Sequence, residues 1–185
     1  MKISVKKLTT CAVMVALSSV LSLISVWRMP LGGSITLLSM LPVCMVSVKY
    51  GLKTGLACSF IFALVQLMLG FSSLMSWGLT AEILAGSFIF DYILAFTVLG
   101  FAGIFGKKSS LRICGGICFS MFLRFISHFV SGVILFASTV PEGWNPFIYS
   151  ICYNGAYMLP EMVFTSIAAV AIFRLPSVSK IITDN

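Results

Sequence analysis

Long apolar runs, each close to the length of a membrane-spanning helix, dominate this sequence. A transmembrane helix needs about 20 consecutive apolar residues. Six stretches approach or exceed that length, namely 8–27, 35–50, 54–73, 82–105, 111–138 and 148–173. Only 9% of the residues are charged, whereas a soluble domain carries about 25%. The sequence therefore predicts an all-α integral membrane protein, a single membrane domain over 1–185 with six transmembrane helices.

Turn-forming residues separate the apolar stretches. The breaks read RMPLGGS, YGLKTG, SSLMSWGL, GKKSS and TVPEGWNP, and their Gly and Pro residues are common helix stops. The first run follows the basic start MKISVKK, as a signal peptide does, but no small-x-small cleavage site ends it. We therefore expect it to persist as the first span. The second stretch is short and contains Pro42.

Basic residues predict how the chain crosses the membrane. With the N-terminus inside, ten of the twelve Lys and Arg residues fall on the cytoplasmic side, which matches the positive-inside bias. We therefore expect a multi-pass protein of the cell membrane with both termini cytoplasmic. The same bias explains the net charge of +7, and without a nucleic-acid-binding motif we expect no nucleic-acid partner. The ten residues are Lys2, Lys6, Lys7, Lys49, Lys53, Lys107, Lys108, Arg112, Arg174 and Lys180.

Motifs for other functions are incomplete. Cys114 and Cys118 share a helical face, but no further Cys or His stands at zinc-ligand spacing, so we expect neither a metal site nor a cofactor. GIFGKKSS only partly matches a phosphate-binding loop, which requires Gly and Ser or Thr where this chain has Phe101 and Lys108. We therefore expect no ATPase activity in this chain. The sequence shows no internal repeat of the kind that would indicate an inverted-repeat carrier.

Four polar residues lie deep inside the predicted spans, where charge is costly. With a helical rise of about 1.5 Å per residue, Asp91 lies about 13 Å below the outer end of its span and His128 about 15 Å. On the same measure Arg124 is about 21 Å deep and Glu161 about 20 Å. The depths predict an upper Asp91–His128 level and a lower Arg124–Glu161 level. For the lower level we expect a structural ion pair between helices, with direct substrate handling as the alternative.

The upper level has many polar and aromatic neighbours. Outer Trp and Tyr residues often form an interfacial belt, and a buried His or Asn is often a packing contact between helices. Together, however, a carboxylate, an imidazole, an amide and several rings predict a pocket for a small, flat, polar molecule, through counter-charge, stacking and cation–π attraction. The neighbours are Trp27, Trp77, Tyr92, Phe136, Trp144, Tyr149, Tyr153, Asn154 and Tyr157.

A resemblance to a known family spans nearly the whole chain. The stretches that carry it are RMPLGGSITLLSMLPV (28–43), FDYILAF (90–96), HFVSGVILFA (128–137) and YSICYNGAYMLPEM (149–162). They resemble the thiamine-specific substrate-binding subunits, or S components, of energy-coupling factor (ECF) transporters. The resemblance implies a vitamin importer whose S component captures thiamine outside and docks on a shared transmembrane coupling subunit with two ATPase subunits. It further implies that the S component tips over in the membrane and releases its cargo inward when ATP drives the module.

The resemblance also implies roles for individual residues. The family's pocket acid matches Asp91, where relatives can carry the longer Glu, and the tyrosine after it matches Tyr92. Phe136 stands where a stacking tryptophan can occur, which keeps stacking but weakens a cation–π contact. The first outer loop, 28–36, resembles the part that closes over the pocket, and Trp27 is a candidate aromatic lid contact. The substrate-binding candidates are therefore Asp91, Tyr92, His128, Phe136, Tyr149, Asn154 and Trp27.

A pair of small residues marks a candidate partner surface. Ala12 and Ala16 in CAVMVA have the small-xxx-small spacing that lets another helix approach closely. This spacing is common in membrane proteins, but the resemblance implies that the family docks through such a pair.

Three alternatives stay open from the sequence. The ligand could be another vitamin or a thiamine precursor, such as the free pyrimidine or hydroxyethylthiazole. A stand-alone facilitator would need a polar stripe that continues to the cytoplasmic side, whereas the inner halves of the spans are almost wholly apolar. In a membrane enzyme, His128 and Asp91 could act as an acid–base pair, but no Ser or Cys nucleophile or metal cluster accompanies them. We therefore expect no enzymatic activity.

Overall fold

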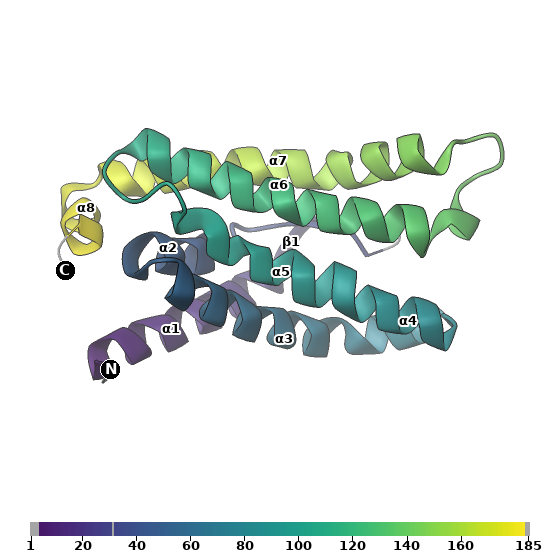
Figure 1. Cartoon of the computed structure of the whole chain (residues 1–185), viewed down its shortest axis with the longest axis horizontal. Helices are drawn as coiled ribbons and strands as arrows, with labels where there is room; N and C mark the ends of the chain where they lie inside the picture. The colour runs from purple at the N-terminus through teal and green to yellow at the C-terminus, as the bar shows by residue number, and fades with distance from the viewer. Residues whose placement is uncertain (1–3, 31, 184–185) are drawn as a thin grey trace.

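Helices that run along one long axis form the molecule (Figure 1). The computed structural model describes residues 4–30 and 32–183, so Lys2 and Asp184 lie outside the described residues. The helices in chain order are α1 (Val5–Ser22), α2 (Leu41–Tyr50), α3 (Leu52–Ser76), α4 (Ala81–Ser87), η1 (Phe88–Leu94), α5 (Ala95–Thr97), η2 (Val98–Gly103), α6 (Ser110–Ile134), η3 (Ala137–Thr139), α7 (Pro146–Arg174) and α8 (Pro176–Thr183). Between α1 and α2, strands β1 (Ser25–Arg28) and β2 (Ser34–Thr36) pair as an antiparallel hairpin.

The predicted membrane architecture is confirmed at the level of mostly helical structure with membrane-length apolar helices. Among the described residues, five helices are long and apolar enough to cross a membrane, with α4 to η2 counted as one helix from Ala81 to Gly103. The second predicted stretch, 35–50, contains only the ten-residue helix α2. Its start was predicted wrongly, because the residues around Ser34–Thr36 pair with β1.

Local sequence explains where several helices begin and end. The side chains of Ser109 and Asn145 accept hydrogen bonds from the first turns of α6 and α7, which satisfies backbone donors that a helix leaves open. Pro42 lies in the first turn of α2, where its missing N–H group is not needed. Gly51 separates α2 from α3 with φ of 83°, a conformation that costs a residue without Cβ little.

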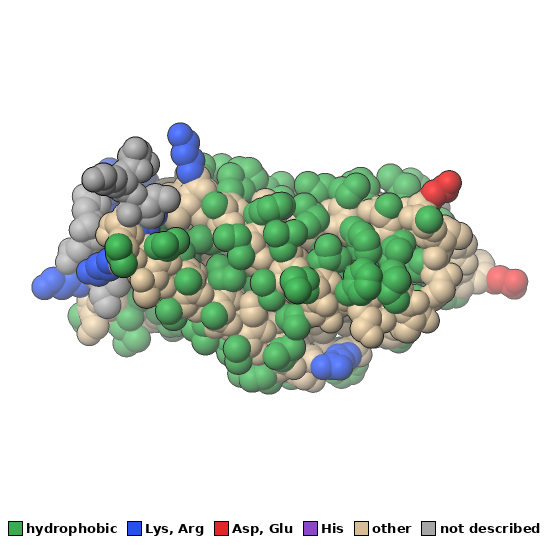
Figure 2. Space-filling model, turned by 90° about the horizontal axis from the view of Figure 1, so that it is seen from below, with side chains coloured by type: hydrophobic (Ala, Val, Ile, Leu, Met, Phe, Trp, Pro, Cys, Tyr) green, Lys and Arg blue, Asp and Glu red, His purple; other side chains and the backbone are tan. Residues whose placement is uncertain are grey.

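The two ends of the molecule differ in charge. Both chain termini lie at one end (Figure 1), which we call the terminal end. In the view of Figure 2, basic side chains gather mainly at the terminal end, whereas acidic side chains project from the opposite end. An apolar surface lies between them. This distribution is the one that the positive-inside bias gives to a membrane protein.

Close helix packing fills the terminal end. A methyl group at Gly103 or Gly116 would overlap a backbone carbonyl oxygen, that of Ser47 or Ala102 respectively. The Ser47 hydroxyl donates to the carbonyl of Gly100 and accepts from the amide of Gly103 at 3.0 Å. Small residues thus let α2, α3, η2 and α6 approach to backbone contact, and this end has a well-packed core.

Candidate functional site

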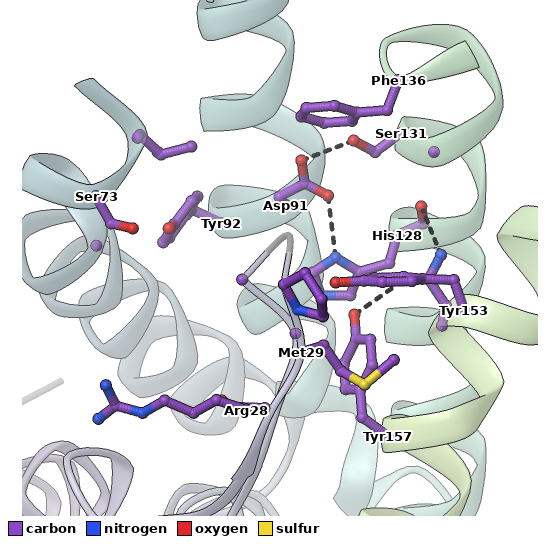
Figure 3. Close-up of a pocket in the computed structure, with 18 of the residues that line it drawn as sticks. Arg28, Met29, Ser73, Asp91, Tyr92, His128, Ser131, Phe136, Tyr153 and Tyr157 are labelled. Carbon is purple, nitrogen blue, oxygen red and sulfur yellow. Dashed lines mark hydrogen bonds and ion pairs between the residues drawn. The ribbon is translucent and has the colours of Figure 1, made fainter. Parts of the chain in front are cut away.

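A cavity of about 460 Å³ opens between the hairpin, α3, η1, α6 and α7. Its size lies within the range of about 300–1,000 Å³ that is usual for small-molecule sites. Its lining includes side chains from helices far apart in sequence, such as Gln66, Asp91, His128 and Asn154. Figure 3 shows several of these side chains converging from different elements.

Asp91 is the acidic centre of the cavity. Its Oδ1 lies 3.0 Å from Nδ1 of His128, and its Oδ2 accepts a hydrogen bond of 2.7 Å from the Ser131 hydroxyl (Figure 3). His128 and Ser131 lie one turn apart on α6, so one carboxylate bridges from η1 to a single face of that helix. The upper level predicted from matched depths is therefore present as a direct contact.

The backbone around Asp91 departs from the α-helix. Residues Phe88–Leu94 form a π-helix within the longer helix that runs from Ala81 to Gly103. Such turns insert extra backbone into a helix and are frequent at functional sites. Asp91 and its neighbour Tyr92 both line the cavity, although consecutive residues of a regular α-helix point about 100° apart. The π-helix thus places two adjacent polar side chains on the same site.

A second polar group comes from α7. The Asn154 side-chain nitrogen donates to the Ser150 carbonyl at 3.0 Å, and its Oδ1 accepts from the Tyr157 hydroxyl at 2.8 Å. On the same helix the rings of Tyr149 and Tyr153 stack with centroids 6.0 Å apart, and Tyr157 meets Tyr153 edge to face at 6.1 Å. The hydrogen bonds hold the Asn154 amide and the Tyr157 phenol in fixed orientations at the cavity wall.

Two buried nitrogen atoms of cavity residues have no partner among the described residues, Nε2 of His128 and Nε of Arg124. The carboxylate of Asp91 can only accept, so Nδ1 of His128 carries the proton of that contact. A neutral imidazole then offers Nε2 as an acceptor. Buried polar atoms are normally paired, and these two leave hydrogen-bonding capacity for a bound molecule.

At the lower level, Arg124 and Glu161 do not form the expected ion pair. The described residues contain no salt bridge between Arg124 and Glu161, although the two charges interact at longer range. Instead, the Arg124 guanidinium lies 4.4 Å from the ring centroid of Phe96 and contacts the sulfur of Met40 at 2.5 Å. Glu161 accepts a bond of 2.5 Å from the hydroxyl of Thr36 in β2. Equal depth did not bring the two charges face to face, because each is turned toward a different neighbour.

The cavity includes six of the seven substrate-binding candidates. Asp91, Tyr92, His128, Phe136, Tyr149 and Asn154 all line it. Trp27 does not, because its side chain projects from β1 with 62% of its surface exposed. The loop 28–36 does contribute to the cavity through Arg28, Met29, Pro30, Gly32, Gly33 and Ser34.

Several lining residues were not among the sequence-based candidates. Ser131 lies one turn from His128, a spacing that could have suggested it. Trp77, Tyr153 and Tyr157 were named as neighbours of the predicted pocket but not as binding candidates. Arg124 was assigned to an ion pair, with direct substrate handling as the alternative. All four line the cavity. No sequence signal distinguishes an aromatic residue at a cavity wall from one in an interfacial belt.

The candidate docking residues lie away from the cavity. Ala12 and Ala16 are exposed on α1, whereas their neighbours Cys11 and Val15 are buried against the rest of the molecule. The pair therefore faces outward, in the position that a partner helix could reach.

The cavity lining combines charged, polar and aromatic groups. It offers one carboxylate, one imidazole, two amides, two guanidinium groups and several aromatic faces. In the described part of the chain, no group of three His, Cys, Asp or Glu residues could hold a metal ion.

Comparisons with known proteins give consistent results. Residues 8–180 match the family model described as thiamine transporter protein (Thia_YuaJ). The chain is 29% identical to the thiamine transporter ThiT of Bacillus subtilis over 181 residues, which covers 90% of each chain. It is 27% identical to ThiT of Lacticaseibacillus paracasei over 138 residues, 68% of this chain and 66% of that protein. The fold matches the structure of ThiT from Listeria monocytogenes with a TM-score of 0.75, at 24% identity over 93% of this chain and 96% of that one.

Proposed function

The chain belongs to the Thia_YuaJ family of thiamine transporters, and from this premise we propose that it captures thiamine in the cavity around Asp91, His128 and Asn154. The observation that carries the proposal is the convergence of these three polar side chains, from η1, α6 and α7, on one cavity. Desolvating them is costly, and a polar aromatic ligand would offset that cost.

Thiamine suits this set of groups chemically. It joins a positively charged thiazolium ring to an aminopyrimidine. The Asp91 carboxylate can accept from the amino side of the pyrimidine, while Asn154 and the Tyr149 phenol orient the molecule. The aromatic rings and the His128 imidazole can cover the flat faces of the ligand, with cation–π attraction for the thiazolium. Tight binding depends on these groups being held in place before the ligand arrives.

The hydrogen bonds of the cavity support such preorganisation. Asp91 is fixed by His128 and Ser131, and Asn154 by Ser150 and Tyr157. Few side chains must change rotamer on binding, so little conformational entropy would be lost.

We further propose that the protein acts as an S component, which delivers thiamine together with an ECF transmembrane coupling subunit and two ATPase subunits. The outward-facing pair Ala12 and Ala16 on α1 supports this partnership as a close-approach surface. The basic residues near the terminal end support an orientation with both termini in the cytoplasm, so that the cavity opens outside.

Thiamine titration of the detergent-solubilised protein tests the binding site. Asn154→Ala and His128→Ala should each weaken thiamine binding by about 100-fold, because each leaves a buried polar partner unsatisfied, while the protein still inserts and purifies. Titration curves identical to that of the unaltered protein for both variants would refute the site.

A separate experiment tests the partner surface. Ala12→Trp or Ala16→Trp should leave thiamine binding intact but abolish ATP-driven thiamine uptake in cells, because the bulky ring prevents close helix approach. Normal uptake by both variants would refute docking through this pair.

A further inference from the structure

Lysine side chains from two different helices lie over one aromatic ring at the terminal end. The ammonium nitrogen of Lys7, on α1, is 5.3 Å from the centroid of the Tyr50 ring, and that of Lys49, on α2, is 5.4 Å from it. The two charges therefore cannot be further apart than the sum of these distances. This end of the molecule is also where basic side chains gather (Figure 2).

The ring holds these charges in a defined place. Tyr50 is half-buried and packs against the apolar core. Cation–π attraction draws each ammonium group toward the ring, whereas the two like charges repel each other. An anion between Lys7 and Lys49 would remove that repulsion and gain from both charges. The corner formed by Lys7, Lys49 and Tyr50 is called the basic corner below.

The described acidic residues lie away from the basic corner. Glu82 begins α4 and Glu142 precedes α7, both at the opposite end of the molecule (Figure 1). Asp91 and Glu161 lie at the two polar levels near the cavity. Lys7 forms no salt bridge within residues 4–30 and 32–183. A counter-charge for Lys7 would therefore come from outside the described part of the chain.

A groove of about 380 Å³ follows α1 next to the basic corner. The hydroxyl groups of Thr9 and Thr10 donate back to the carbonyls of Val5 and Lys6, at 3.0 and 2.9 Å. Because these donors are already used within the helix, the groove presents mainly methyl and other apolar groups beyond Lys6. Its lining residues are Val5, Lys6, Thr9, Thr10, Val13 and Met14.

We propose that the basic corner and the groove together bind an anionic phospholipid, with its phosphate near the ammonium groups of Lys7 and Lys49 and one acyl chain along α1. Basic pockets between membrane helices are known to bind anionic headgroups. Exposed apolar residues such as Leu8 and Val13 continue along the same helix, as expected where headgroups meet hydrocarbon. A free phosphate ion would satisfy the charges but leave the groove empty, whereas a phospholipid accounts for both.

This lipid site is separate from the thiamine cavity. Among the described residues, the two share no lining residue. The inference therefore does not depend on the proposed function, and thiamine binding can serve as an independent measurement. Because α1 also carries Ala12 and Ala16, a lipid held between α1 and α2 would fix the helix that presents the proposed partner surface.

The test uses the full chain, purified in detergent and stripped of lipid. Native mass spectrometry measures the binding of dioleoylphosphatidylglycerol, which is anionic. Dioleoylphosphatidylcholine is the matched lipid, because it has the same acyl chains and a phosphate but no net charge. In a separate arm, inorganic phosphate replaces the lipid. The thermal midpoint is recorded with each addition, since a molecule that binds only the folded state raises it.

The variants separate a defined site from a general attraction to positive charge. Lys7→Gln and Lys49→Gln each remove one charge from the basic corner, and Lys7→Arg retains it. Thr9→Phe fills the groove without changing the charge. Arg112→Gln is the matched control, because it removes one exposed positive charge from α6, a helix that contributes to neither the ring contacts nor the groove.

We expect phosphatidylglycerol to bind more tightly than phosphatidylcholine and to raise the thermal midpoint, whereas inorganic phosphate should not. Lys7→Gln and Lys49→Gln should each weaken phosphatidylglycerol binding about fivefold. Thr9→Phe should also weaken it, and Lys7→Arg and Arg112→Gln should leave it nearly unchanged. Thiamine affinity should be the same in all five variants.

Three results would overturn the lipid site. Equal binding of the two lipids would show that the charges do not select the headgroup. An equal loss of binding in Arg112→Gln and Lys7→Gln would show a diffuse attraction without a defined site. Stabilisation by inorganic phosphate as large as that by phosphatidylglycerol would assign the basic corner to a free anion. Failure of the unaltered protein to bind thiamine would refute the proposed function but leave these lipid measurements valid.

Discussion

The two ends of this molecule differ in how closely their helices pack. At the terminal end, Gly103 and Gly116 bring η2 and α6 into backbone contact with neighbouring elements. At the other end the helices diverge around a cavity of about 460 Å³ whose wall carries Asp91, His128 and Asn154. The close-packed end secures the fold, which allows the hollow end to keep polar groups that are costly to bury. Stability and binding should therefore respond to different substitutions.

The largest expected effect is on stability, at the close-packed end. Gly116→Leu places a branched side chain where even a methyl group would overlap the Ala102 carbonyl oxygen. We expect a loss of about 3 kcal/mol in the free energy of unfolding, read as a thermal midpoint lowered by about 10 °C in detergent. The fraction that remains folded should bind thiamine normally. A variant as stable as the unaltered protein would show that this end is not closely packed.

The next effect is on binding, at the cavity. Asp91→Asn keeps the shape of the side chain but removes its charge, and thus the counter-charge for a cationic ligand. Thiamine affinity should fall about 100-fold, equivalent to about 2.7 kcal/mol, with a shift in the thermal midpoint much smaller than that of Gly116→Leu. Calorimetric titration measures the first quantity and a thermal melt the second. A large loss of stability without a loss of affinity would reverse the roles assigned to the two ends.

A third substitution acts where the two regions meet. Thr36→Val removes the hydroxyl that donates to the buried carboxylate of Glu161, so an acceptor loses its partner at a cost of about 1–3 kcal/mol. Because Thr36 lies at the base of the hairpin, we expect both stability and thiamine affinity to decrease. Thr36→Ser, which retains the hydroxyl, is the matched control. If only one of the two quantities changed in Thr36→Val, the regions would be independent at this point.

The smallest expected effect is a gain. Phe136 lines the cavity, and Phe136→Trp adds a ring with stronger cation–π attraction of about 0.5–1 kcal/mol. Thiamine affinity should rise about threefold, measured by titration under the same conditions. Phe136→Leu, which removes the ring, should have the opposite effect. Equal affinities for all three side chains would mean that position 136 does not contact the thiazolium.

The sequence predicted which residues gather at the cavity end better than it predicted the contacts of their individual side chains. Depth along each span was enough to pair Asp91 with His128, because both helices are continuous from their outer ends and the two side chains meet at 3.0 Å. The same reasoning failed for Arg124 and Glu161, since depth fixes the height of a residue but not the direction in which it points. Rotation about the helix axis depends on packing against neighbours, which a single sequence does not reveal.

The β1–β2 hairpin shows a second limit of prediction from the sequence. The residues 23–28 were predicted as the end of an apolar span and the start of a loop, and nothing in their composition distinguishes a strand from the last turn of a helix. Trp27 and Trp77 are equivalent by residue type and by position near an outer end, yet only Trp77 lines the cavity. The pairing of β1 with β2 is irregular between Ser25 and Trp27, and such a shift redirects side chains in a way that no pattern predicts.

The π-helical stretch Phe88–Leu94 has a consequence for how this site could be lost or regained. Deleting a single residue from that stretch would let the backbone relax into an ordinary α-helix. Because a π-turn holds one residue more than an α-turn, the helices on either side would keep their facing, whereas Asp91 and Tyr92 would no longer both point into the cavity. One codon, rather than a rebuilt helix, would therefore be enough to separate these two adjacent polar side chains from their shared site.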